Sequence, residues 1–395
     1  MIDTFSIARL PRIEFGRGSM KKLPGLIQQY GRQILLISGG ASVQGSALWA
    51  GLMATLSQQG TIYLHCAVSG EPSPELIDEL VARFCSEDIQ LVVAVGGGSV
   101  LDAAKAVAGL LKVKRSVMDY LEGVGPELAY QGPAIPFIAV PTTAGTGSEA
   151  TKNAVLSRQG ENGFKKSFRD DRLVAEYAVV DPEWLSTCPP ELIAANGMDA
   201  LTQLLESYVS IKASPITDAL NLSGLHMIRD SLLKWYIEGE KAESAMDGMA
   251  YAAMLSGITL AQTGLGSVHG LASPLGAFYP ISHGVACGTL VAEATRVNLE
   301  ALHTRAASDI SLQKYAHVSE VMHQQHFSDN KTAGWALADL LGDWCEQMNL
   351  PRLSKFGITA FELDHIVKHS RGSSMKTNPI VLEDREIKAL LESRL

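Results

Sequence analysis

The first half of the chain alternates short apolar runs with longer segments of helical periodicity, and this alternation restricts the possible folds more than any other feature. Five runs have the length and composition of buried strands: Gln33–Ser38, Thr61–Val68, Leu91–Val95, Phe137–Val140 and Ala178–Asp181. Between them, apolar residues recur at helical spacing, as in Ser73–Cys85 and Val100–Leu111. This alternation predicts a mainly parallel sheet with helices on both faces.

The second half of the chain has a different pattern of apolar residues, because the strand-like runs stop at about Pro189. Long helical patterns follow, punctuated by glycine and proline: Glu191–Lys212, Pro215–Glu238, Lys241–Thr263 and Leu337–Met348. A chain of 395 residues is long enough for two domains with full cores. We therefore predict an α/β domain over residues 1–185 and an all-helical domain over residues 186–395.

The charge balance argues against nucleic acid as a partner. The formal net charge is −9, whereas neutralising phosphates requires a basic face. The one basic cluster, Lys165, Lys166, Arg169 and Arg172, is interrupted by two aspartates and is typical of a solvated surface. An anionic substrate remains an alternative reading of this cluster.

Cysteine usage and the absence of targeting signals favour a cytoplasmic protein. The five cysteines are scattered without a C-x-x-C pair, as expected of reduced thiols: Cys66, Cys85, Cys188, Cys287 and Cys345. The N-terminus lacks a basic region followed by an apolar run, so no secretory signal is expected. No segment approaches the roughly 20 apolar residues of a membrane helix.

A glycine cluster, Gly96–Ser99, connects the run Leu91–Val95 to the helical pattern that begins near Val100. Glycine lets the backbone approach a phosphate closely, and the first N–H groups of a helix hold an anion. Asp102 lies in that first turn, where it favours the helix terminus or binds a ribose hydroxyl. Because the cluster is not a G-x-G-x-x-G fingerprint, a tight turn without a ligand stays open as the alternative.

A second polar loop, Pro141–Glu149, follows the run Phe137–Val140. It supplies hydroxyl groups, including those of Thr142, Thr143 and Thr146, at the carboxyl edge of the predicted sheet. Ligands of open α/β sheets bind at that edge.

The helical half holds a candidate metal-binding set. His269 and His283 lie fourteen residues apart, and each is followed by glycine. Imidazole is the commonest protein ligand for divalent metals. Asp199 and Gln203 are four residues apart, so they share one face of a helix. An aspartate near a helix start is more often a cap, but with the two histidines it makes a plausible metal set.

Over nearly its whole length the sequence resembles the iron-containing (group III) alcohol dehydrogenase family, whose fold is shared with dehydroquinate synthase. The resemblance is carried by an ordered series of motifs: Phe15–Gly18, Gly96–Ser99 with Asp102, Pro141–Glu149, Asp181-Pro182, Gly197–Leu201, the block from His269 to His283, and Thr377–Pro379. It implies an N-terminal dinucleotide-binding α/β domain, a helical metal- and substrate-binding domain, and a cleft between them.

The resemblance also implies an activity and roles for residues. The family transfers hydride between NAD or NADP and a small alcohol or aldehyde, and its members commonly form homodimers or larger assemblies. By position, Lys165 lies where the family has a lysine near the nicotinamide. Asp199, His269 and His283 would hold Fe²⁺ or Zn²⁺, which polarises the alcohol oxygen. The remaining family positions contact the cofactor: Gly97, Gly98, Ser99, Thr142, Thr143 and Thr146.

Two positions depart from the family pattern. A fourth metal-binding histidine is replaced by Gln203, which can coordinate only through a neutral carbonyl oxygen. A further histidine close to the nicotinamide is replaced by Ser273. Three protein ligands with one open position still make a usual catalytic site. Because of the two substitutions, a metal-free reductase and a nucleotide-binding protein without catalysis are kept as alternatives, beside a lyase of the dehydroquinate synthase type.

A third departure concerns cofactor choice. NAD-preferring relatives place an aspartate after the strand Gln33–Ile37, where it binds the ribose and repels a 2′-phosphate. This chain has Gly39 and Gly40 within a small, uncharged segment there. The segment predicts that NADP(H) is tolerated.

Overall fold

A computed structural model describes residues 4–395 and divides into two compact units. The α/β unit consists of Ala8–Arg158 and Lys165–Cys188. The helical unit consists of Pro189–Leu395 together with two short segments, Gln159–Phe164 and the described N-terminal residues 4–7.

The α/β unit is built on a parallel sheet of six strands in the order β1-β8-β5-β4-β2-β3. Their bounds are β1 Arg12–Phe15, β2 Gln33–Ser38, β3 Ile62–Ala67, β4 Leu91–Gly96, β5 Phe137–Pro141 and β8 Tyr177–Val180. Every residue of β4 and β5 is buried, as expected of central strands covered on both faces.

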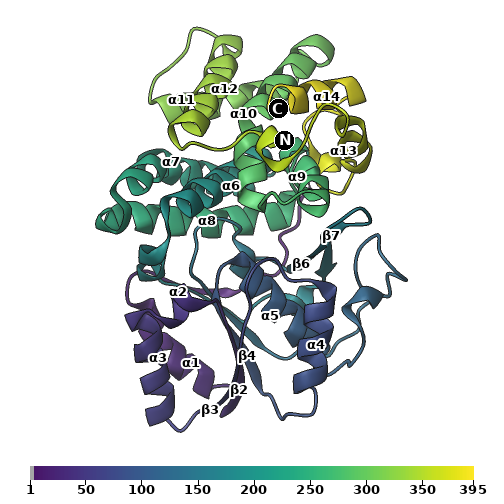
Figure 1. Cartoon of the computed structure of the whole chain (residues 1–395). Coiled ribbons are helices and arrows are strands. Elements are labelled where there is room, and N and C mark those ends of the chain that lie inside the picture. The colour runs from purple at the N-terminus through teal and green to yellow at the C-terminus, as the bar shows by residue number, and fades with distance from the viewer. Residues whose placement is uncertain (1–3) are drawn as a thin grey trace. The chain divides into compact units, whose positions relative to one another are not determined.

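Helices pack on the two faces of this sheet, as Figure 1 shows. One face carries α1 and α3, whose Leu23, Ile27 and Leu56 share a core with alternate residues of the strands. The other face carries α4 and α5. The bounds are α1 Leu23–Gln28, α2 Ala41–Gln44, α3 Ala47–Gln58, α4 Pro74–Phe84 and α5 Gly98–Leu110. The predicted α/β architecture is confirmed.

The register of the sheet brings three loop starts to one edge. Ser38 of β2 pairs with Val95 of β4, and Gly96 of β4 pairs with Pro141 of β5. Backbone hydrogen bonds extend this pairing into the loops, from Gly39 N to Val95 O at 2.9 Å and from Thr142 N to Gly96 O at 3.0 Å. The segments that follow β2, β4 and β5 therefore lie side by side at the carboxyl edge.

Three strands were not anticipated from the sequence. β1 lies at a sheet edge and is largely exposed, so it has no apolar run. β6 (Asn153–Arg158) and β7 (Phe164–Arg169) form a separate two-stranded sheet. β7 contains Lys165, Lys166 and Arg169 and buries only Phe168, so its composition is that of a charged surface segment.

The helical unit contains nine α-helices within the described residues, and its α7 has the bounds predicted from the sequence. Ser214 and Thr217 form a capping box at the start of α7, and Pro215 occupies the first turn. The helices are α6 Pro190–Val209, α7 Pro215–Glu238, α8 Glu243–Thr263, α9 Ser267–Phe278, α10 His283–Arg305, α11 Ile310–His323, α12 Asn330–Gln347, α13 Leu363–His369 and α14 Asp384–Glu392.

Short 3₁₀ helices complete the secondary structure of residues 4–395: Ser19–Lys22, Val117–Asp119, Ser148–Ala150, Asp171–Leu173, Pro182–Thr187, Gly239–Lys241, Leu353–Phe356 and Met375–Thr377. Among the described residues, no helix has both the length and the apolar character needed to span a membrane.

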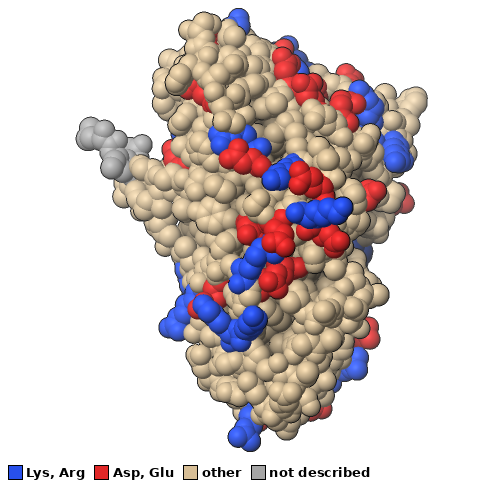
Figure 2. Space-filling model, turned by 90° about the vertical axis from the view of Figure 1, so that its left-hand side faces the viewer, with Lys and Arg blue, Asp and Glu red and all other residues tan. Residues whose placement is uncertain are grey.

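The charged surface mixes both signs. On the face drawn in Figure 2, basic side chains lie next to acidic ones over most of the charged area. In the basic cluster predicted from the sequence, Lys165 pairs with Glu71, and Arg169 pairs with Glu122. Ion pairs of this kind remove the excess positive charge that a phosphate backbone would require.

Candidate metal and cofactor sites

The first candidate site is the carboxyl edge of the parallel sheet, where α5 begins. Gly97 is the N-cap of α5 and provides no side-chain cap, so the first N–H groups of this helix lack an intrahelical partner. A Cβ on Gly98 would lie 2.5 Å from Thr146 Oγ1, and a Cβ on Gly97 would lie 3.2 Å from Thr143 Oγ1. The two predicted loops are therefore packed directly on each other, and glycine is what permits it.

Asp102 joins these loops from the first turns of α5. Its carboxylate accepts hydrogen bonds from Ser148 Oγ and, at 3.2 Å, from Val155 N. Lys105 Nζ lies 3.3 Å from the same carboxylate and donates to Ser148 O at 2.8 Å. Lys105 is fully buried, and burial lowers the pKa of its ammonium group. We predicted that Asp102 caps the helix or binds a ribose hydroxyl. In the structure its carboxylate is bonded to donors of the α/β unit.

Loop residues after β2 leave room beside the sheet edge. Ser38 Oγ donates to Gly39 O at 2.9 Å and lies 2.8 Å from His65 Nε2. A Cβ on Gly40 would meet no atom within 4 Å, whereas one on Gly39 would lie 3.0 Å from Val43. The described residues place no carboxylate in the Ser38–Ser42 segment.

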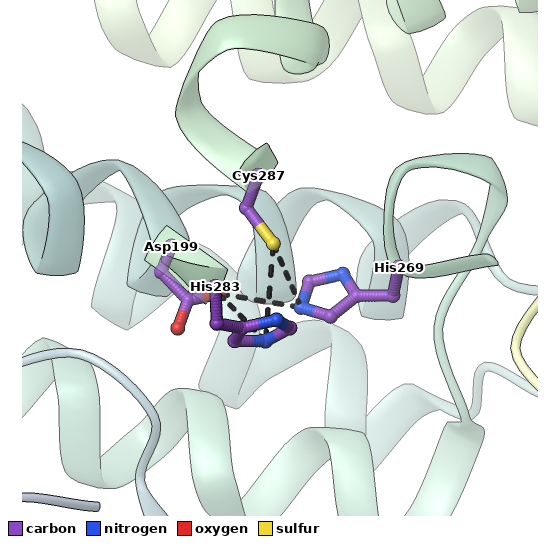
Figure 3. A group of neighbouring side chains, drawn as sticks. All are labelled: Asp199, His269, His283 and Cys287. Atoms are coloured by element: carbon purple, nitrogen blue, oxygen red, sulfur yellow. Dashed lines mark hydrogen bonds and ion pairs between the residues drawn. The ribbon is translucent and has the colours of Figure 1, made fainter. Parts of the chain in front are cut away.

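The second candidate site lies in the helical unit, where three helices bring four side chains together (Figure 3). Asp199 comes from α6, His269 from α9, and both His283 and Cys287 from the first turns of α10. One ligand atom from each residue lies within 4.8 Å of all the others. Asp199, His269 and Cys287 are buried, and only His283, with its side chain 26% exposed, reaches the surface.

Individual distances show how compact this cluster is. His269 Nε2 lies 3.3 Å from Asp199 Oδ1, and His283 Nε2 lies 3.8 Å from the same oxygen. Cys287 Sγ lies 3.7 Å from His269 Nε2 and 3.9 Å from His283 Nε2. The second oxygen of Asp199, Oδ2, is buried without a hydrogen-bond partner. A buried carboxylate oxygen without a donor is costly unless a cation meets it.

Glycines allow the helices to come this close. A Cβ on Gly284 of α10 would lie 2.6 Å from Ala195 O of α6, and one on Gly288 would lie 2.9 Å from Met198 Cβ. Gly284 and Gly288 are one turn apart, so they form a small-residue strip along α10. This strip allows α10 to pack closely against α6, which places His283 and Cys287 beside Asp199.

Glu206 orients His269. It lies seven residues after Asp199 and hence on the same face of α6. Its carboxylate accepts hydrogen bonds from Gly266 N at 2.9 Å and Val268 N at 2.7 Å, which caps the start of α9. It also lies 2.7 Å from His269 Nδ1. Because a carboxylate only accepts, His269 donates through Nδ1, which leaves Nε2 directed at the cluster.

The motif Thr377–Pro379 supports the same helix start. Asn378 Oδ1 accepts a hydrogen bond from Ser267 N at 3.0 Å, and Thr377 Oγ1 donates to Leu265 O. Asn378 is itself bonded to Asn298 at 2.7 Å. This part of the resemblance therefore positions α9 rather than contacting the cluster directly.

The negative charge of the buried Asp199 carboxylate requires a positive partner. Burial raises the pKa of the Asp199 carboxyl, but His283 and His269 lower it by more, so it lies below its usual value. Burial lowers the pKa of His269, whereas Cys287 and the hydrogen bonds with Asp199 and Glu206 raise it well above its usual value. Burial raises the pKa of the Cys287 thiol to about 12. Either a protonated imidazole or a bound cation can balance the Asp199 charge.

The side chain of Gln203 is bonded to α8. Its carbonyl oxygen, the atom that would have to coordinate a metal, accepts a hydrogen bond from Ser256 Oγ at 2.6 Å. Cys287, in contrast, lies in the cluster although the sequence reading treated it as an ordinary thiol. Its position four residues after His283 places both on one face of α10, and this spacing could have revealed it.

The cluster fits a divalent metal. In a tetrahedral site, bonds of about 2.0–2.1 Å to nitrogen or oxygen and about 2.3 Å to sulfur place neighbouring donors roughly 3.3–3.6 Å apart. The separations of 3.3, 3.7, 3.8 and 3.9 Å lie close to that range. Carboxylate, imidazole and thiol are also the donor types that transition metals prefer.

A parallel α/β unit with a glycine-lined helix start, and a helical unit with a buried metal-type cluster, define a class of nucleotide-linked, metal-dependent enzymes. Sequence comparison agrees with this class. Residues 11–182 match the iron-containing alcohol dehydrogenase model, and residues 193–395 match its C-terminal domain model. The chain belongs to the iron-containing alcohol dehydrogenase family, which confirms the predicted family and makes the chain an oxidoreductase.

Individual relatives extend along nearly the whole chain. Alcohol dehydrogenase 4 of Schizosaccharomyces pombe is 31% identical, covering 96% of this chain and 87% of the relative. The NADPH-dependent butanol dehydrogenase of Clostridium saccharobutylicum is 30% identical over 97% and 96%. The crystal structure of a 1,3-propanediol oxidoreductase matches with a TM-score of 0.90 at 25% identity and covers all of both chains. The predicted fold class is therefore confirmed.

Proposed function

We propose that this protein reduces small aldehydes, and oxidises the corresponding alcohols, by metal-assisted hydride transfer with NADP(H), and that it also accepts NAD(H). The observation that carries this proposal is the convergence of Asp199, His269 and His283 on one buried point within a family of alcohol dehydrogenases. These three residues would hold Fe²⁺ or Zn²⁺. When bound, the metal acts as a Lewis acid that polarises the substrate oxygen.

The α/β unit is the proposed dinucleotide-binding domain. The unpaired N–H groups at the start of α5, beside Gly97 and Gly98, suit the cofactor pyrophosphate. Ser99, Thr142, Thr143 and Thr146 supply hydroxyl donors at the same edge. The bound nicotinamide supplies or accepts the hydride. Lys165, predicted near the nicotinamide, pairs with Glu71 in this unit, so its proposed role is to position the surrounding segment.

The choice of NADP(H) rests on the loop after β2. Gly40 is exposed with open space around its Cα, and no carboxylate stands in this loop to repel a 2′-phosphate. One of the relatives is named for its NADPH dependence. The open backbone at Gly39 and Gly40 is therefore the proposed adenosine end of the cofactor site.

The helical unit is the proposed metal- and substrate-binding domain. Glu206 holds His269 in the tautomer whose Nε2 lone pair faces the cluster. Only His283 is partly exposed, which suits a site that is open to a small ligand on one side. The relatives are named for different small alcohols, butanol and 1,3-propanediol, so we propose a small, uncharged alcohol or aldehyde rather than one named substrate.

We propose that the protein is cytoplasmic and that it forms a homodimer or a larger homo-oligomer. The five cysteines are free thiols, as reducing compartments maintain them. The edge strand β3 exposes Ile62 by 59% and Tyr63 by 40%, and such apolar edges are commonly covered in assemblies. Light scattering of the purified protein tests the assembly, and a monomer would contradict it.

Cofactor stoichiometry tests the proposed reaction. The purified protein is incubated with NADPH and a panel of short and long aldehydes, and cofactor and product are quantified together. We expect each aldehyde reduced to consume one NADPH, with faster turnover than with NADH. A lyase would instead convert its substrate without net change in the cofactor, and that result would contradict the proposal.

A further inference from the structure

We propose that Cys287 is the fourth protein ligand of the metal, in place of the histidine that Gln203 has replaced. The inference rests on the proposed function, because it concerns the metal held by Asp199, His269 and His283. It implies that the site binds divalent cations that favour a thiolate, such as Zn²⁺ and Co²⁺, more tightly than hard cations such as Mg²⁺.

The surroundings of Cys287 distinguish it from Cys345 and Cys188. Cys345 Sγ donates to Gly288 O at 3.0 Å, and Cys188 Sγ donates to Thr142 O at 3.5 Å. Both therefore behave as ordinary thiols bonded to the backbone. The fully buried Cys287 Sγ instead faces the Nε2 atoms of His269 and His283, at 3.7 and 3.9 Å (Figure 3). These are the two imidazole atoms available to a metal.

The helix geometry explains how a cysteine can replace the missing ligand. His283 and Cys287 are one turn apart on α10, so both point from the same face toward Asp199. The Gly288 backbone packs against Met198 and holds this face close to α6. On α6 the side chain one turn after Asp199 is Gln203, and its oxygen is bonded to Ser256. The ligand has thus moved from α6 to α10 while the point of convergence is retained.

Charge also favours the thiolate. Asp199 and a Cys287 thiolate would together carry two negative charges, and the two imidazoles are neutral ligands. A divalent cation then balances the charges of these two ligands, which lowers the cost of burying them. When the cation binds, a metal–sulfur bond forms and the thiol proton leaves to the solvent buffer. No oxidant or reductant is required.

Cobalt substitution tests this assignment directly. The protein is stripped with a chelator and loaded with Co²⁺ alone, and its absorption spectrum is recorded. A cobalt–thiolate bond gives an intense near-ultraviolet charge-transfer band that nitrogen and oxygen ligands do not give. We expect this band in the unaltered protein and in Cys345→Ser and Gln203→Ala, and its loss in Cys287→Ser.

Metal affinity supplies a second readout that does not depend on activity. We expect Cys287→Ser to lower the Zn²⁺ affinity at least about 10-fold more than the Mn²⁺ affinity, because serine offers a hard oxygen in place of sulfur. Cys345→Ser should change neither. Retained NADPH binding by each variant shows that the protein is folded.

Two results would overturn the inference. Co²⁺ bound with no charge-transfer band would show that Cys287 is not a ligand, and the proposed three-ligand metal site would stand. A protein that binds no Co²⁺ would overturn the inference together with the metal in the proposed function. NADPH-linked aldehyde reduction by that metal-free protein would then show that the reductase activity itself is retained.

Discussion

The two candidate sites of this chain are built in different ways. At the sheet edge of the α/β unit, glycine backbone and helix-terminal N–H groups make the site, and Gly98 packs directly on Thr146. In the helical unit, side chains from α6, α9 and α10 make it. A backbone site depends on local chain geometry, whereas a side-chain cluster depends on how separate helices pack.

Buried carboxylates show the same contrast. Glu149, in the α/β unit, is 3% exposed, and burial raises its pKa to about 7 despite the nearby Lys105. Asp199, in the helical unit, is 1% exposed, yet two histidines hold its pKa below the usual value. The histidines of the cluster thus stabilise the charge of Asp199, whereas burial outweighs Lys105 at Glu149.

The largest expected effect is loss of the metal in Asp199→Ala. Structural zinc sites gain about 10–16 kcal/mol from four ligands, so one ligand contributes roughly 2.5–4 kcal/mol, or about 100- to 1000-fold in affinity. Competition with a chromophoric chelator measures this loss. Asp230→Asn, which removes a surface carboxylate paired with Arg229, is the control and should bind metal normally. Equal affinity in the two variants would contradict the site.

Glu149→Gln should stabilise the folded protein at high pH, because it removes a buried carboxyl group that is costly to ionise. Because the pKa of Glu149 is about 7 in the folded protein and 4.5 for the unperturbed carboxyl of the unfolded chain, the folded state binds the proton more tightly. Stability is therefore highest below pH 4.5, falls as the pH rises to about 7, and is constant above it. The variant should gain about 3 kcal/mol at pH 9 and nothing at pH 4. Urea unfolding at both pH values measures this, and equal gains would refute it.

Removing the charge that orients His269 should weaken the metal site less than removing a ligand. Glu206→Gln keeps an acceptor for the start of α9 but loses the charged partner of His269 Nδ1. We expect metal affinity to fall about 10–100-fold while NADPH affinity is unchanged. Calorimetric titration of both ligands separates the two. A fall in NADPH affinity alone would show that Glu206 does not act through His269.

Gly98→Ala tests the backbone site. Its Cβ would meet Thr146 Oγ1 at 2.5 Å, so the start of α5 or the loop must shift. We expect NADPH affinity to fall about 10-fold, equivalent to roughly 1.4 kcal/mol, with metal affinity unchanged. Fluorescence titration with NADPH measures it. Gly51→Ala on α3, where a Cβ meets no atom within 4 Å, is the matched control.

The smallest expected effect concerns cofactor choice. Gly40→Asp introduces a carboxylate into open space beside the sheet edge. Repulsion of the 2′-phosphate should lower the ratio of kcat/KM for NADPH to that for NADH by a few-fold to about 10-fold. Gly40→Asn provides the uncharged control. An unchanged ratio would place the adenosine end of the cofactor elsewhere.

Local features of the fold were predictable because they leave a local signal. The central strands are buried on both faces, so their apolar runs predicted β2 with its observed bounds. The edge strand β1 and the charged β7 leave no such signal. Asp199, His269 and His283 were proposed as a metal set from their residue types and then from the family resemblance, and the structure brings their side chains together.

Features that depend on tertiary packing were not predictable in the same way. The spacing of Cys287 from His283 indicates a shared face of α10, but its approach to Asp199 depends on α10 lying against α6, which Gly284 and Gly288 permit. Gln203 was expected in the metal set from its spacing to Asp199, but its oxygen is bonded to Ser256 of α8. Spacing along one helix identifies a shared face, and only the neighbouring helices determine what that face meets.

Metal content and aldehyde reduction, measured on the same preparation, test most directly whether hydride transfer depends on the helical cluster. The protein is assayed with NADPH as purified, after chelation, and after re-addition of Zn²⁺ or Fe²⁺, with Asp199→Ala treated in parallel. We predict stoichiometric metal, loss of activity on chelation, and recovery on re-addition in the unaltered protein only. Full activity in metal-free protein would contradict the account.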